Sequence, residues 1–221
     1  MKLKRFISPA ILFAAFIIYT ITVKFVDVAA VGPLGSSVGF SHINAFVAKI
    51  FSYNEFFYDM TKIIGLFAFM CVGAFVIIGL VELVKNKSFK KVDLAVYAMG
   101  FIYVVTALLY VLFEIVVINF RPVLEDGELE ASFPSTHTML AVAVFGSACI
   151  YFADRVKNSA LKTVLTAACV TFAAAMPVLR LMSGVHWFTD IIGGVLIGCA
   201  VMSLYMALFK VSSGSGENKK A

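Results

Sequence analysis

Two histidines and an aspartate in the second half of the chain have the spacing that nucleophilic catalysis needs. His186 and Asp190 are four residues apart, so on a helix they share one face. A carboxylate in that position holds one imidazole nitrogen protonated and leaves the other free to attack. His137 then remains as a proton donor for the leaving oxygen.

Two arginines and a helix start could hold the group that is attacked. Arg121 and Arg180 suit a tetrahedral oxyanion, because guanidinium presents forked donors that match phosphate oxygens. Ser135 and Thr136 directly precede an apolar run, where a helix would offer free N–H groups and its positive dipole end. Taken singly, these residues read as helix caps, interfacial anchors or a structural histidine. Together they predict phosphoryl transfer through a covalent phosphohistidine.

The composition indicates which elements position these residues. Of the 221 residues, 62% are hydrophobic and 14% are charged, and the mean hydropathy is +0.98. These values exclude a water-soluble domain. A bilayer core takes roughly 20 apolar residues per helix. Uncharged runs of about that length predict an all-α bundle of six transmembrane helices, at 6–23, 63–81, 94–113, 138–153, 163–179 and 191–209.

Lysine and arginine cluster in alternate loops, which predicts an orientation. Segments 2–5, 85–91, 155–162 and 210–220 hold most of the 18 basic residues. The positive-inside rule therefore predicts a multi-pass plasma-membrane protein with both termini in the cytoplasm. The net charge of +5 then needs no nucleic acid to explain it. All the residues of the candidate site fall at the extracytoplasmic ends of spans, where ionisable groups are functional candidates.

The rest of the chain reads as one domain, 1–211, with its core motifs in 114–190 and a disordered tail, 212–221. The first apolar run is read as a retained span rather than a cleaved signal. Segment 40–51 has helical periodicity and predicts a short amphipathic helix in the interface. The acidic loop 125–130 reads as a solvated turn, with a cation site as the alternative. Gly194 and Gly198 form a GxxxG pattern that favours packing within the bundle, with a homodimer contact as the alternative.

Three segments of the chain resemble the three motifs of the type 2 phosphatidic acid phosphatases. They are Arg121-Pro122, then Pro134 to His137, then Arg180 followed by His186 and Asp190. The resemblance covers about residues 60–209 and implies a six-helix membrane enzyme. It implies that His186 is the nucleophile, Asp190 its partner and His137 the general acid. It assigns phosphate binding to Arg121, Arg180 and the Ser135-Thr136 segment. No metal or other cofactor is implied.

The chain departs from that family pattern in three places. Thr136 replaces the usual glycine, and Leu179 replaces the usual serine before Arg180. Glu114 stands seven residues before Arg121, where the family has lysine. Seven residues make about two helical turns, so we expect Glu114 to share a face with Arg121 and to pair with it or with Arg180. The alternative is altered specificity or lost activity.

The favoured function is hydrolysis of a lipid phosphate monoester or diphosphate among the membrane lipids. Phosphatidate, phosphatidylglycerol phosphate and a polyprenyl diphosphate all place an anion at the headgroup plane, and recycling of an envelope lipid or isoprenoid carrier is the expected setting. The alternative is a non-catalytic lipid-phosphate binding protein or transporter, which Glu114 motivates. A serine protease using Ser135 or Ser183 lacks its Gly-x-Ser-Gly element, and the related vanadium haloperoxidases are soluble enzymes.

Overall fold

The computed structural model describes residues 3–125 and 127–217, with side chains as far as Phe209. The described chain is all-helical, and six of its helices are long and apolar enough to cross a membrane, which confirms the predicted fold class. The helices are α1 (Ile7–Phe25), α2 (Ser41–Ile50), α3 (Glu55–Asn86), α4 (Leu94–Ile115), α5 (Thr136–Arg155), α6 (Ser159–Met182) and α7 (Phe188–Glu217). Short 3-10 turns lie at Leu3–Phe6, Pro33–Gly35 and Phe89–Lys91.

α3 is much longer than its uncharged run, 63–81, because a helix needs backbone hydrogen bonds rather than apolar side chains. It begins where the side chain of Asn54 accepts a hydrogen bond from Phe57 N, and it ends at Lys87, which has left-handed backbone angles. Glu55 and Lys62 therefore lie within the helix. For the same reason α7 continues to Glu217, where the sequence predicted a disordered tail from residue 212. The last tail residues, 218–221, lie outside the described residues.

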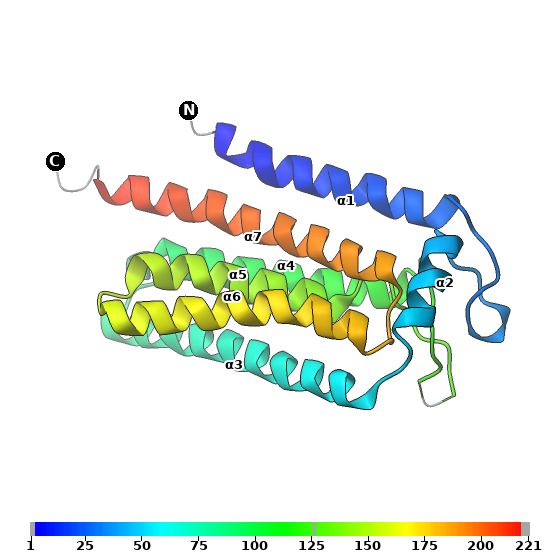
Figure 1. Ribbon diagram of the computed structural model, residues 1–221. Coiled ribbons are helices and arrows are strands. Elements are labelled where there is room, and N and C mark those ends of the chain that lie inside the picture. Colours follow the sequence, from blue (N-terminus) through cyan, green and yellow to red (C-terminus); the bar gives the residue numbers. More distant parts are fainter. Residues whose placement is uncertain (1–2, 126, 218–221) are drawn as a thin grey trace.

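α5 is the centre of the bundle and packs against α3, α4, α6 and α7, while α1 lies on the far side of α7 (Figure 1). Gly194 and Gly198 of α7 face α5, where an added Cβ would meet Ser135 O at 2.6 Å and Val142 Cβ at 2.7 Å. The GxxxG pattern is therefore used inside the bundle, as the favoured interpretation predicted. This close packing brings the first turn of α7 against the start of α5.

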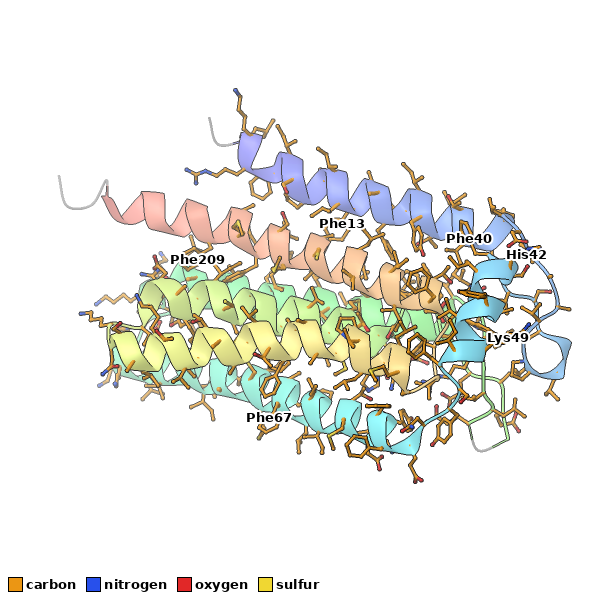
Figure 2. All side chains as sticks on the ribbon, viewed as in Figure 1. Phe13, Phe40, His42, Lys49, Phe67 and Phe209 are labelled. Carbon is orange, nitrogen blue, oxygen red and sulfur yellow. The ribbon has the colours of Figure 1, made fainter. Side chains whose placement is uncertain are left out.

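α2 lies across one end of the bundle, which we call the α2 end, and α1 starts and α7 finishes at the opposite end (Figure 1). His42 and Lys49 mark the α2 end in Figure 2. The large apolar side chains of the helix α2 point away from the protein, since Phe46 is 64% exposed. The polar side chain of Asn44 on the same helix is fully buried. This is the reverse of a helix on a soluble protein. The predicted short helix is present, with its apolar face available to a surrounding bilayer.

Candidate active site

His186, in the turn before α7, lies beside Asp190 in the first turn of that helix. Both are buried, and His186 Nδ1 lies 3.7 Å from Asp190 Oδ2. Asp190 is held by two donors, Trp187 N at 2.9 Å from Oδ2 and Asn119 Nδ2 at 3.4 Å from Oδ1. The carboxylate therefore has a fixed position beside the imidazole, at a distance slightly longer than a hydrogen bond.

Arg180, near the end of α6, contacts the other nitrogen of His186. Its Nη2 donates to His186 Nε2 at 2.7 Å. A guanidinium has no acceptor, so Nε2 must carry the lone pair, and the proton of a neutral ring must sit on Nδ1, facing Asp190. This arrangement gives His186 the tautomer that a nucleophile needs.

The protonation of His186 follows from its surroundings. Burial lowers the pKa of His186 well below its usual value of 6.5, and the positive charges of Arg180 and Arg121 lower it further. The imidazole is therefore neutral at neutral pH.

Arg180 is a buried cation with few compensating contacts. Its side chain is 1% exposed, Nη1 donates to Thr61 Oγ1 at 3.3 Å, and its guanidinium carbon lies 5.4 Å from the centre of the Tyr58 ring. No carboxylate of the described residues forms an ion pair with it, and its Nε has no hydrogen-bond partner there. A buried charge without a partner is costly. An anion placed at this point would remove that cost.

Arg121 lies in the connection between α4 and α5 and has anionic partners. Its side chain pairs with Glu125 and, at 3.2 Å, with Glu130. The carboxylate of Glu125 also accepts a hydrogen bond from the Tyr58 hydroxyl. Glu125 and Glu130 therefore contact the site, while Gly127, Glu128 and Glu130 are exposed, as the prediction of a solvated turn requires.

Glu114 does not make the contact that the sequence predicted. α4 ends at Ile115, so Glu114 and Arg121 are not on one helical face. Glu114 is exposed, and the carboxylates that pair with Arg121 are those of Glu125 and Glu130. The residue that replaces the family's lysine thus stands outside the ion pairs of the described site.

The start of α5 supplies the other predicted residues. Ser135 is fully buried, its backbone N donates to Asp190 O at 3.0 Å, and its hydroxyl donates to Thr138 Oγ1 at 3.0 Å. Thr136 and His137 follow in the first helical turn, and His137 Nδ1 is buried with no hydrogen-bond partner among the described residues. The start of α5 is therefore joined to Asp190 through Ser135, and Arg180 is joined to His186, while Thr136 and His137 line a neighbouring cavity.

Sequence reasoning missed the contribution of α3. Thr61 accepts from Arg180 Nη1 and donates to Tyr58 O at 2.6 Å, so it holds the terminal nitrogen of the guanidinium that does not contact His186. Lys62, the next residue on α3, lies over the ring of Tyr58, with Nζ 4.3 Å from the ring centre. Their spacing on α3 gave no signal, because a threonine and a tyrosine in an apolar helix are common.

Two buried asparagines were also missed. Asn119 donates to Asp190 and accepts from Gly39 N at 3.2 Å, so it joins the α1–α2 connection to the carboxylate. Asn44 on α2 contacts Thr189, the residue before Asp190. A signal was present for Asn44, since it is a strongly polar residue within a largely apolar helical segment.

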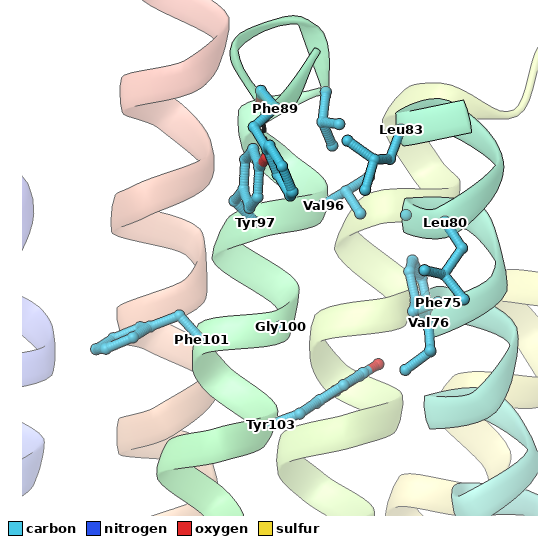
Figure 3. A pocket seen from close by; sticks show the side chains of 12 residues that line it. Phe75, Val76, Leu80, Leu83, Phe89, Val96, Tyr97, Gly100, Phe101 and Tyr103 are labelled. Atoms are coloured by element: carbon cyan, nitrogen blue, oxygen red, sulfur yellow. Dashed lines mark hydrogen bonds between the residues drawn. The ribbon is translucent and has the colours of Figure 1, made fainter. Parts of the chain in front are cut away.

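One apolar and one polar cavity border the site. An apolar cavity of about 470 Å³ lies between α3, α4 and α5 and reaches Thr136 and His137. Tyr103 joins it to a second apolar cavity of about 350 Å³ between α3 and α4, seen in Figure 3 with Phe75 and Tyr103 on its facing walls. A third cavity, about 560 Å³, is more polar and is lined by Tyr53, Tyr58, Lys62, Val123, Leu124, Glu125 and Val185.

The chain is similar to known proteins in sequence and in fold. The family model of the PAP2 superfamily matches residues 95–213. A crystal structure described as the first transmembrane PAP2 type phosphatidylglycerolphosphate phosphatase from Bacillus subtilis superimposes with a TM-score of 0.56 at 21% identity, covering 95% of this chain and 96% of that one. No curated protein matches the chain. α1, α2 and α3 precede the matched segment, although all three contact the site.

Proposed function

Because the chain belongs to the PAP2 superfamily, a family of membrane phosphatases, we propose that it hydrolyses a lipid phosphate through a phosphohistidine at His186. The observation that carries this proposal is the contact between Arg180 and His186. A buried guanidinium without a carboxylate partner among the described residues lies 2.7 Å from the deprotonated nitrogen of a neutral imidazole. An anion that binds the guanidinium is thus held next to a nucleophile.

The reaction proceeds in two displacements. With the phosphate held by Arg180 and Arg121, His186 Nε2 attacks phosphorus while the bond to the lipid oxygen breaks. His137 donates a proton to that oxygen, so the lipid leaves as an alcohol, or as a lipid phosphate when the substrate is a diphosphate. Water then attacks phosphorus with its proton passing to His137, the P–N bond breaks, and inorganic phosphate is released. Asp190 stabilises the positive charge that the ring of His186 carries in the phosphohistidine intermediate, between the two displacements.

The apolar cavities support a lipid substrate. The larger one, between α3, α4 and α5, has His137 at its edge, so a leaving oxygen near His137 can belong to a molecule whose tail lies in that cavity. Phosphatidate, phosphatidylglycerol phosphate and polyprenyl diphosphate all satisfy this requirement. The relative from Bacillus subtilis bears the name of a phosphatidylglycerolphosphate phosphatase, which makes that lipid the first to test.

The loop charges support an orientation in the membrane. Basic residues gather at the end opposite α2, as in segment 85–91, so this end is cytoplasmic in our proposal and both termini lie there. The site then faces the extracytoplasmic side, with α2 in the interface. The exposed apolar side chains of α2 suit that position.

The test is phosphate release from a panel of the three lipids by the purified chain in detergent, beside His186→Ala. We expect release from at least one lipid, no release by His186→Ala, and an acid-labile phosphoryl group on the parent in rapid quench. Equal release by both proteins would refute the proposal.

A second candidate function is a lipid-phosphate binding protein or transporter that does not turn its ligand over. The observation that favours it is the pairing of Arg121 with two carboxylates, which weakens its hold on phosphate. Tight binding of all three lipids with no release would support this candidate, and a trapped phosphohistidine would exclude it.

A further inference from the structure

Glu125 lies where a bound anion would lie. Its carboxylate pairs with the guanidinium of Arg121 and accepts the hydroxyl proton of Tyr58. Burial acts to raise the pKa of Glu125, but the hydrogen bond from Tyr58 and the charges of Arg121 and Arg180 outweigh it, so the pKa is lowered. The side chain is ionised at neutral pH, and the field of both phosphate-binding arginines acts on it.

These contacts are the ones that a phosphate oxygen would use. Both groups are oxyanions that accept charged hydrogen bonds from a guanidinium fork. The second nitrogen of that fork, Arg121 Nη2, already faces Glu130 at 3.2 Å. Arg121 is therefore occupied by the chain's own carboxylates, whereas Arg180 has no such partner among the described residues.

We propose that Glu125 is an internal competitor for the anion site, a carboxylate that a phosphate must displace from Arg121 and Tyr58. This inference rests on the proposed function, since it concerns the same anion site. The displaced side chain has room to move, because it is 31% exposed and borders the polar cavity that Tyr53 and Lys62 also line.

The cost of moving Glu125 away from Arg121 makes the binding free energy less favourable, by the same amount for every phosphate. A free phosphate ion has only the arginines and hydroxyls to offset this cost. A lipid phosphate also buries its tail in the apolar cavity beside His137, which contributes about 25 cal/mol for each Å² of apolar surface. Glu125 thus raises the dissociation constant of every phosphate by the same factor, and a lipid phosphate still occupies the site because its tail adds binding energy that a free phosphate ion lacks.

The same exchange assists product release. Once the P–O bond to the lipid has broken and the phosphohistidine has been hydrolysed, the phosphate has lost its tail. Glu125 then returns to Arg121 and displaces the ion into the polar cavity, which is also lined by Lys62, a half-exposed cation paired with Asp59 at 3.0 Å. The residue acts on the binding and release of anions and leaves the bond-breaking steps to His186 and His137.

The experiment measures binding of inorganic phosphate and of dodecyl phosphate to the full chain in detergent by calorimetry. Glu125→Gln keeps the shape of the side chain and removes its charge. Glu128→Gln is the matched control, because Glu128 is exposed on the same loop and pairs with Glu125 only through the backbone. Thermal midpoints of both variants establish that they are folded.

We expect Glu125→Gln to bind both ligands more tightly by the same factor, roughly tenfold, as for the loss of a half-buried competing charge. Glu128→Gln should bind as the parent does. Unchanged or weaker phosphate binding by Glu125→Gln would overturn the proposal, and weaker binding would make Glu125 a support for Arg121. Binding requires no turnover, so a parent chain that hydrolyses no lipid would refute the proposed function and leave this comparison valid.

Discussion

The side-chain amide of Asn44 holds Thr189 at two points. Its Oδ1 accepts from Thr189 N at 3.2 Å, and its Nδ2 donates to Thr189 Oγ1 at 2.9 Å. Tyr19 adds a third contact, from its hydroxyl to Thr189 O at 3.1 Å. The first turn of α7, which carries Asp190, is thus fixed by α2 and α1, two helices that lie outside the matched family segment.

Asn44→Ala should therefore lower both stability and activity. The change leaves Thr189 N without its buried acceptor, which costs about 1–3 kcal/mol, and it lets Asp190 move relative to His186. Thermal unfolding in detergent and phosphate release measure the two effects. Lys49→Ala, on the exposed part of the same helix, should change neither, and an equal loss in that control would mean that α2 as a whole is sensitive.

Thr61 positions Arg180, and a pair of variants separates this role from packing. Thr61→Val keeps the shape and removes the acceptor for Arg180 Nη1, so KM should rise roughly fivefold, equivalent to about 1 kcal/mol. Thr61→Ser restores the hydroxyl and should recover the parent KM. Failure of the serine variant to recover it would show that the methyl group matters instead.

The lowered pKa of His186 predicts how stability and rate respond to acid. The unfolded chain takes up a proton at this histidine near pH 6.5, whereas the folded chain does so only at lower pH. Stability contributed by His186 is thus fully present above pH 6.5 and is lost as the pH falls below it. The thermal midpoint of His186→Asn should therefore depend less on pH than that of the parent between about pH 7.5 and 5.5.

The same shift concerns catalysis. A nucleophilic His186 stays neutral below pH 6.5, so the acid limb that it contributes to kcat/KM should lie below that pH. A limb centred at pH 6.5 or above would contradict a buried, arginine-flanked imidazole.

Glu114→Lys restores the lysine of the family pattern, yet its effect should be small. Glu114 is exposed and makes none of the ion pairs of Arg121, so screening limits its influence on the site. KM for a lipid phosphate should fall less than about threefold, and the difference should vanish in high salt. A larger, salt-resistant gain would place this position within the phosphate site.

The proposed orientation is checked by labelling single introduced cysteines in intact cells. His42→Cys, on the exposed side of α2, should react with a membrane-impermeant maleimide, whereas Lys90→Cys should react only after the cells are opened. The reverse pattern would invert the topology. The four native cysteines are free and lie within spans, and the parent chain sets the background.

Much of the fold could be predicted because it depends on local properties of the sequence. Uncharged runs identified all six spans, and the period of segment 40–51 identified α2. The spacing of His186 and Asp190 correctly placed them together, although the expected shared helix face is wrong, because α7 begins at Phe188 and His186 lies in the turn before it.

The missed features depend on packing between segments that are distant in sequence. Glu114 and Arg121 were expected to share a face, but α4 ends at Ile115 and nothing in the composition marks that end. Thr61 meets Arg180 only because α3 packs against α6. Hydropathy also treats charged residues as loop, so it could not place Lys62 inside a helix or Glu125 inside the site.

The two kinds of cavity beside the site have a thermodynamic consequence for the reaction. The apolar cavity reaches His137, while the polar cavity is bordered by Glu125. For a lipid phosphate bound as proposed, the alcohol product remains dissolved in the bilayer and the phosphate ion enters water. Resynthesis would require two molecules from immiscible phases to meet again at one histidine. This separation of the products therefore hinders resynthesis and adds to the favourable free energy of phosphoester hydrolysis.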